Sequence, residues 1–183
     1  MKSLFIKSLF VMLVLALAAC GGETPEQAQE EEAVDDGIRT IEVYGTDDMK
    51  FVVREAQDGL RTGGASGQYI LLEAIEAEPG EELRIRLTTN STLPPSAMSH
   101  NLAVVDLGTD VDDFARKSLQ AADNEYISPE YEDRVIVTTS MLGAGETDTI
   151  TFTVPETTGE YDYICTFPGH FAAGMVGKLI VQE

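Results

Sequence analysis

Hydrophobic and polar residues alternate along most of the chain from Ile38 to the C-terminus. In the stretches 82–88 and 149–154, every second residue is apolar and the residues between are charged or threonine. This period of two is typical of a β-strand that buries one face. Similar short runs occur near 39–44, 50–55, 69–76, 101–106, 134–139, 160–165 and 176–182. The pattern therefore predicts a protein built from short strands.

Turn residues separate these runs, and one interruption has a helical period. Gly- and Pro-containing clusters such as 78–80 and 143–145 lie between the apolar stretches. About eight strands over roughly 145 residues indicate an all-β fold, a Greek-key β-sandwich. After Thr109 or Asp110 as N-cap, a short helix is predicted from the spacing of Val111, Phe114, Ala115, Ser118 and Ala122. We find no internal repeat, so residues 39–183 are expected to form one β-sandwich domain with one short inserted helix.

The first 19 residues predict an export signal. Lys2 and Lys7 precede an apolar run, 9–19, that is too short to span a bilayer but suits the hydrophobic region of a signal peptide. The run ends in Leu-Ala-Ala-Cys20, which resembles a bacterial lipobox, in which the cysteine receives lipid and becomes the new N-terminus. We expect 1–19 to be a lipoprotein signal peptide and Cys20 to be lipidated. The alternative is an ordinary signal peptide that is cut beside a chance cysteine.

Residues 20–38 are expected to form an acidic, flexible tether. Seven acidic residues and no basic one lie between Cys20 and Gly37. The whole chain has 12 basic and 32 acidic residues and a formal charge of −20. Removal of 1–19 takes away two lysines and no acid, which leaves 10 basic and 32 acidic residues and a charge of −22. Such a charge argues against nucleic acid and anionic headgroups as partners and favours basic partners or simple solubility.

Three metal-binding residue types lie in one loop near the C-terminus. Cys165, His170 and Met175 follow one another at five-residue intervals, in a segment that also contains Pro168 and Gly169. Soft cysteine and methionine sulfur favours Cu(I), whereas imidazole suits copper in either oxidation state. Two histidines and one cysteine with a weak axial methionine form the ligand set of a blue copper centre. The loop supplies three of these four ligands.

The fourth ligand is expected to be His100. The chain has two histidines, and His100 lies just before the apolar run 102–105 of a predicted strand. Strand packing would bring it to the loop from 65 residues away. Cys165 is the one cysteine beyond the signal region, and we reject a disulfide to Cys20, because Cys20 belongs to the acidic tail and Cys165 ends a strand.

Two other site chemistries are alternatives. Zinc binds cysteine and histidine, and three protein ligands plus water would form a catalytic zinc site. Met175 argues against zinc, as does the lack of a further Glu or His in the loop to act as a base. A Cys-His hydrolase is a weaker alternative, because no third polar residue in the loop is placed to orient the imidazole.

Several segments resemble the azurins. The hexapeptide Cys165–His170 (CTFPGH) resembles their ligand loop, and the stretches 93–101 and 133–146 are similar to azurin as well. The resemblance covers 39–182. Azurins have their methionine four residues after the loop histidine, whereas Met175 is five after His170, and 170–178 instead resembles plastocyanin. This hybrid loop resembles that of auracyanins, which are membrane-tethered blue copper proteins. The disulfide of azurins has no counterpart here.

The resemblance implies a role for each site residue. His100, Cys165 and His170 would be the equatorial ligands of one copper ion, and Met175 the long axial ligand. The Ser99 carbonyl oxygen would be a distant fifth contact to the copper, although the resemblance does not settle this contact because the loop differs from that of azurins. Asn101 would tie the two ligand segments together, and the backbone amides near Asn101 and Phe167 would donate to the Cys165 sulfur. An apolar surface patch through which electrons leave would be formed by Met49, Met98, Pro168, Phe171 and Ala172.

The resemblance implies an electron carrier, not an enzyme. Four protein ligands leave no open position for a substrate, so we expect a cupredoxin that carries one electron at a time between redox complexes. Its partners would be c-type cytochromes or membrane electron-transfer complexes, with membrane attachment through lipid on Cys20. The protein would be a monomer on the periplasmic or cell-surface face of a bacterial membrane. A role in copper trafficking or detoxification is the alternative, and a copper oxidase or nitrite reductase would need more histidines than the chain has.

Overall fold

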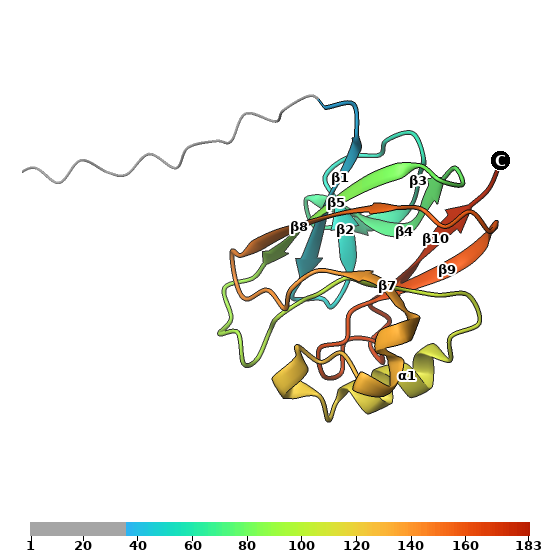
Figure 1. Ribbon diagram of the computed structural model, residues 1–183. Helices are drawn as coiled ribbons and strands as arrows, with labels where there is room; N and C mark the ends of the chain where they lie inside the picture. The colour runs from blue at the N-terminus through green and yellow to red at the C-terminus, as the bar shows by residue number, and fades with distance from the viewer. Residues whose placement is uncertain (1–35) are drawn as a thin grey trace, which may run out of the picture. The chain divides into compact units, whose positions relative to one another are not determined.

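The computed structural model describes residues 36–183 (Figure 1). The predicted signal peptide 1–19, Cys20 and all but the last three residues of the predicted tether lie outside the described residues. None of the helices within 36–183 is long and apolar enough to span a bilayer.

The described part of the chain contains ten strands. They are β1 (Arg39–Thr46), β2 (Phe51–Val53), β3 (Leu60–Ser66), β4 (Tyr69–Ala77), β5 (Glu82–Asn90), β6 (Ala103–Val105), β7 (Val135–Thr138), β8 (Thr147–Thr153), β9 (Gly159–Ile164) and β10 (Val176–Val181). They pair in the order β7-β6-β9-β10-β4-β2-β1-β5-β8, and β3 pairs with β4. The pairs β1–β5 and β4–β10 are parallel, and all others are antiparallel. The sheet curls into a barrel-like sandwich, which confirms the predicted all-β fold.

The apolar positions of the alternating sequence pattern are the buried positions of the strands. In β5 the residues Leu83, Ile85 and Leu87 are fully buried, while their neighbours face outward. In β8 each of the five threonine or acidic positions faces outward or is partly covered, and Ile150 and Phe152 pack on the core. One large apolar cluster fills the sandwich and includes Cys165 and Met175. The two sulfur side chains therefore lie at the edge of the core and away from solvent.

Helix α1 (Val111–Ser118) forms where the spacing predicts it. Asp110 is the N-cap, and its Oδ1 accepts a hydrogen bond of 3.0 Å from the Asp113 amide. Phe114 and Ser118 are the buried positions of the helix. The predicted extension to Ala122 is wrong, because Ala121 N donates to Ser118 O and the chain turns into a separate 3₁₀ helix, Ala122–Asn124. A second 3₁₀ helix, Pro129–Arg134, leads into β7.

The helix and the loop between β9 and β10 lie at the same end of the sandwich (Figure 1). Arg39, at the start of β1, belongs to the other end, because β1 runs from there to Thr46 beside His100. Over eight residues a strand spans about 25 Å. The end that carries the helix is therefore the end that carries the predicted site.

Candidate metal centre

The β9–β10 hairpin holds three of the predicted ligands. Cys165 directly follows β9, and Met175 directly precedes β10. Their backbones are joined, since Cys165 N donates to Met175 O at 3.1 Å, and Met175 N donates to His170 O at 2.9 Å. Gly169 and Gly174 have φ of +88° and +83°, which the reversal of the loop requires. The loop is thus closed on itself and places His170 between the two sulfur residues.

His100 reaches the loop from a neighbouring strand. It forms an isolated bridge with Leu142, in which each residue donates its amide to the carbonyl of the other at 2.9 Å. The strand β6, three residues further on, pairs with β9. This pairing brings together residues that are 65 positions apart in the sequence.

The structure brings His100, Cys165 and His170 together in one buried cluster. The Cys165 Sγ atom lies 3.4 Å from His170 Nδ1 and 4.0 Å from His100 Nδ1, and the three donor atoms all lie within 4.8 Å of one another. His100 and Cys165 are fully buried, and His170 is 2% exposed. Zinc bonds to nitrogen and sulfur are about 2.0–2.3 Å long, so one transition-metal ion of similar size fits among three atoms at this spacing.

Burial sets the protonation of the three groups in the metal-free site. Burial, with a smaller effect of His170, lowers the pKa of His100 to about 3, against an opposing effect of the Thr46 backbone. Burial lowers the pKa of His170 to about 4. Burial raises the pKa of the Cys165 thiol to about 12, and the backbones of Asn101 and Phe167 oppose that rise. The imidazoles are therefore neutral and ready to bind metal, whereas the thiol must lose a proton when a cation binds.

Asn101 connects the two ligand segments. Its Nδ2 donates to Thr166 Oγ1 and its Oδ1 accepts from Thr166 N, both at 2.8 Å. Asn101 is fully buried and Thr166 is 2% exposed. These residues directly follow His100 and Cys165 in sequence, so the paired bonds fix the spacing of the two ligands. Phe167 packs against His170 with ring centroids 4.8 Å apart.

The sequence analysis did not identify Gly45 and Thr46, which lie against the His100 side chain. A Cβ on Gly45 would lie 2.6 Å from the His100 ring, so the position has no room for a side chain. Within residues 36–183, His100 Nε2 and Thr46 Oγ1 are buried without a hydrogen-bond partner. The Thr46 backbone still lies near enough to raise the histidine pKa slightly. Only the fold shows this contact, because no feature of the β1 sequence predicts packing against a residue more than 50 positions away.

Lys50 also supports the site. Its Nζ donates to Ala173 O at 2.5 Å, and it lies beside Gly174. The hydrogen bond pins the turn that ends in Met175 to the β1–β2 connection. A single lysine between two strands gives no sequence signal of this contact.

The remaining predicted residues fall into different environments. Met175 is fully buried beside the cluster. Ser99 is buried, and its Oγ donates to Pro95 O at 2.8 Å. Of the predicted surface patch, Pro168 and Ala172 are exposed, while Met49 and Phe171 are half-buried.

Met98 requires a correction, because it is only 7% exposed. Its amide donates to Pro94 O at 3.1 Å, in a turn that directs the side chain inward. It contributes almost nothing to the surface patch.

The fold and the cluster define a class of protein, the cupredoxins: a β-sandwich with a buried His-Cys-His site at one end. A sequence model described as copper binding proteins, plastocyanin/azurin family, matches residues 71–182, more than half of the chain. The chain belongs to this family. The family and the donor set identify the cofactor as one copper ion and favour it over the zinc alternative.

Individual relatives are consistent with this family. Azurin of Alcaligenes faecalis is 35% identical over 113 residues, which are 60% of this chain and 87% of that azurin. Auracyanin-B of Chloroflexus aurantiacus is 41% identical over 85 residues, which are 46% of this chain and 36% of the relative. Outer membrane protein H.8 of Neisseria meningitidis is 36% identical over 104 residues, 56% of this chain. The matched region spans about half (55%) of the H.8 protein.

Solved structures support the same fold. The structure of dithionite-reduced auracyanin from the photosynthetic bacterium Roseiflexus castenholzii superposes with a TM-score of 0.60 at 25% identity, covering 79% of this chain and 97% of that one. The azurin Az-iso2 of Methylomonas sp. strain J superposes with a TM-score of 0.60 at 26% identity, covering 79% and 98%.

Proposed function

We propose that the protein is a one-electron carrier with a single type 1 copper centre. In this proposal His100, Cys165 and His170 are the equatorial ligands and Met175 is the axial ligand. The observation that carries the proposal is the buried His-Cys-His cluster, whose three donor atoms lie within 4.8 Å of one another. A metal held in this way has no open position for a substrate, so the centre suits electron transfer and not bond chemistry.

The surroundings of the cluster support this role. Burial keeps both imidazoles neutral before metal binds. The Asn101–Thr166 hydrogen bonds and the Lys50 hydrogen bond hold the ligand segments in place. When copper is bound, it supplies the change of charge between Cu(I) and Cu(II). A rigid ligand frame keeps the rearrangement that accompanies this change small.

The electron leaves, in this proposal, beside His170. Pro168 and Ala172 are exposed on either side of it in the loop, with Phe171 half-buried between. A small apolar contact of this kind suits a complex that forms and separates at each transfer. Partners would be c-type cytochromes or membrane electron-transfer complexes, and the protein would act as a monomer.

Export and membrane attachment belong to the same proposal. The azurin relatives and the relative named as an outer membrane protein support an exported location, periplasmic or at the cell surface. The lipobox-like segment ending at Cys20 supports a lipid anchor, and the acidic residues after it support a flexible tether. Electrophoretic mobility and mass before and after Cys20→Ser test the anchor, because lipid attachment needs the thiol.

The function is tested by visible and EPR spectra of the full-length chain loaded with Cu(II) and titrated with ascorbate. We expect an intense blue band and a narrow copper hyperfine splitting, both of which bleach and return reversibly. A pale tetragonal copper spectrum would contradict the site. Rapid loss of copper to a chelator would instead favour trafficking, because a carrier retains its ion through many turnovers.

Ala172→Glu tests the exit surface. The added carboxylate lies on the exposed loop, and each partner in self-exchange would bring the same charge to the contact. We expect the rate of electron self-exchange, measured by NMR line broadening, to fall by about tenfold at low salt while the blue band is unchanged. An unchanged rate would remove Ala172 from the contact surface.

A further inference from the structure

A groove lies beside the ligand loop and is not part of the metal centre. It has a volume of about 550 Å³ and runs between α1 and the loop 166–172. Ala115 and Leu119 line it from the helix, and Phe167, Phe171 and Ala172 line it from the loop. The loop segment that contains His170 thus forms one wall of the groove. The lining of the groove is largely apolar.

Leu119 marks this groove as a contact surface. It is 42% exposed, and among residues 36–183 the only other large hydrophobic residue with comparable exposure is Leu93, at 41%. Isolated exposed leucines are common, but this one lies in a hollow that continues into the exposed loop residue Ala172. Together they form an apolar surface with a polar rim, which is the usual anatomy of a docking site.

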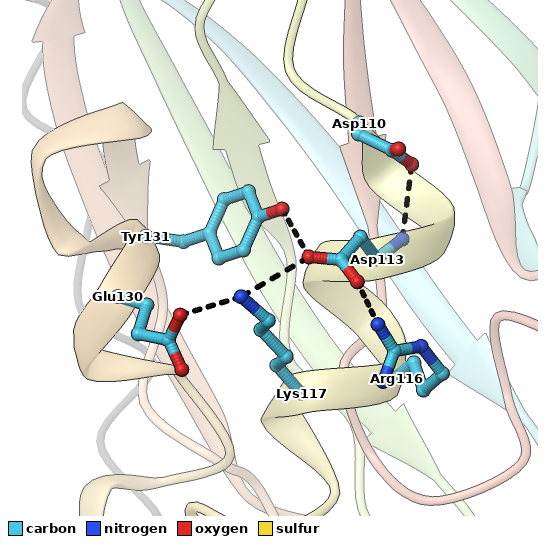
Figure 2. A network of polar contacts seen from close by, with 6 residues as sticks. All are labelled: Asp110, Asp113, Arg116, Lys117, Glu130 and Tyr131. Atoms are coloured by element: carbon cyan, nitrogen blue, oxygen red, sulfur yellow. Dashed lines mark hydrogen bonds and ion pairs between the residues drawn. The ribbon is translucent and has the colours of Figure 1, made fainter.

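The rim of the groove is acidic. Three carboxylates, those of Asp110, Asp112 and Asp113, and one basic side chain, Arg116, line it. Figure 2 shows that the bases on α1 are already engaged: Arg116 and Lys117 pair with Asp113, and Lys117 also pairs with Glu130. Tyr131 Oη donates to the same Asp113 carboxylate at 2.6 Å.

Uncompensated negative charge therefore remains at the groove. Asp112 is exposed, lines the groove and has no ion pair among the described residues. Asp110 also lines it and caps the helix through a backbone amide, which leaves its charge in place. The network in Figure 2 ties α1 to the 3₁₀ helix 129–134, so these carboxylates are presented by a fixed surface.

We propose that this groove docks a partner protein through a lysine- or arginine-bearing segment with an apolar tip. The proposal rests on the proposed electron-carrier function, because docking here would place the partner beside His170. Charge complementarity selects the occupant. A second copy would bring a formal charge of −20, and the segment 20–38 has seven acidic and no basic residues, so both would be repelled.

Asp112→Lys and Leu119→Ser test the docking site. The probe is mitochondrial cytochrome c, a basic haem protein, and the measurement is the second-order rate of its reduction by the full-length Cu(I) protein in stopped flow. At low ionic strength we expect Asp112→Lys to lower the rate about fivefold to tenfold and Leu119→Ser about threefold. The effect of Asp112→Lys should largely disappear near 0.5 M salt.

Two matched controls separate the groove from general charge and hydrophobicity. Asp58→Lys changes the net charge equally but lies beside Arg39, at the other end of the sandwich. Leu93→Ser removes an equally exposed leucine outside the groove. We expect both to leave the rate within about 1.5-fold of the parent. Equal slowing by a variant and its control would overturn the proposal.

Small redox probes distinguish this proposal from the proposed function. If the copper site takes up electrons from ascorbate in all variants but none of them alters the rate with cytochrome c, the groove proposal fails alone. If the parent protein is not blue or does not exchange electrons with ascorbate, the function itself fails. A dimer in sedimentation that Leu119→Ser abolishes would assign the groove to a second copy and would also overturn the proposal.

Discussion

At the scale of single residues, Asn101 does more for the site than its position at the start of a strand indicates. It satisfies both the amide and the hydroxyl of Thr166, and all of these atoms are buried. A buried donor without a partner costs about 1–3 kcal/mol. Asn101 is therefore both a structural link and the residue that sets the distance between His100 and Cys165.

Asn101→Ala should reduce stability and disturb the site together. Because Thr166 N–H loses its acceptor, we expect the free energy of unfolding to fall by about 2–3 kcal/mol in urea denaturation. The position and intensity of the thiolate-to-copper absorption band should also change. Asn90→Ala, at an exposed asparagine, is the control and should leave both unchanged. A normal spectrum in the Asn101 variant would show that the link does not position the ligands.

The sequence predicted the proposed ligands better than the residues that pack against them and hold them in position. Rare residue types carry the signal: with two histidines and one cysteine beyond the signal region, few assignments were possible. Gly45 and Lys50 could not be found in this way, because common residues act here through contacts with segments distant in sequence. Met98 was misplaced for a related reason, since a hydrophobic residue near a site fits a surface patch and a core equally well.

At the scale of elements, the pairing of β9 with β10 contains an unusual contact. Tyr163 lies directly opposite Gly177, and its ring occupies the space above the glycine, where a Cβ would approach the Tyr163 hydroxyl to 2.2 Å. The hydroxyl is buried and has no hydrogen-bond partner among the described residues. Burial, together with Glu73, raises the pKa of Tyr163, so the group stays neutral.

Tyr163→Phe should therefore stabilise the protein. The substitution keeps the ring and its edge-to-face contact with Phe51 and removes a hydroxyl that has lost its water without gaining a partner. We expect the free energy of unfolding to rise by up to about 1 kcal/mol, measured as the urea midpoint at unchanged slope. Tyr161→Phe is the contrasting variant, because Tyr161 Oη donates to Thr157 O at 2.8 Å, and it should destabilise. A loss of stability in the Tyr163 variant would contradict this account.

Among the ten described strands, β3 is the one that the sequence analysis did not predict, because it lacks alternation. β3 reads Leu-Arg-Thr-Gly-Gly-Ala-Ser, with two glycines and register shifts against β4, so no period of two is present. It forms because the strongly patterned β4 offers it an edge. The two 3₁₀ helices were missed because each is too short to show a period.

At the scale of the whole molecule, carboxylates join separate segments of the fold. Glu81 pairs with Arg39 at 2.7 Å, and Asp148 accepts from the Ser140 amide at 2.8 Å. Burial alone would raise the pKa of Glu81, but its bonds to Arg39 and to the Glu78 amide lower it overall. The Ser140 amide, with that of Thr149, lowers the pKa of Asp148.

These lowered pKa values predict a loss of stability in acid. A carboxyl whose pKa is lower in the folded state contributes stability that is complete above its unfolded pKa, about 4, and is lost as the pH falls through the folded value. Asp148→Asn should cost about 1 kcal/mol at pH 7 and progressively less as the pH falls below about 4, measured by urea denaturation of the copper-free protein. Asp58→Asn, at an exposed site, is the control and should leave the free energy of unfolding at pH 7 almost unchanged. A constant difference for Asp148→Asn across the range would contradict the prediction.

The bridge between His100 and Leu142 links the copper site to the closing of the sandwich. An unfolded chain has Cys165, His170 and Met175 close together in sequence, but His100 joins them only after β6 has paired with β9. The full set of proposed ligands therefore exists only in the closed sandwich, and the loop between β9 and β10 lacks one of them by itself.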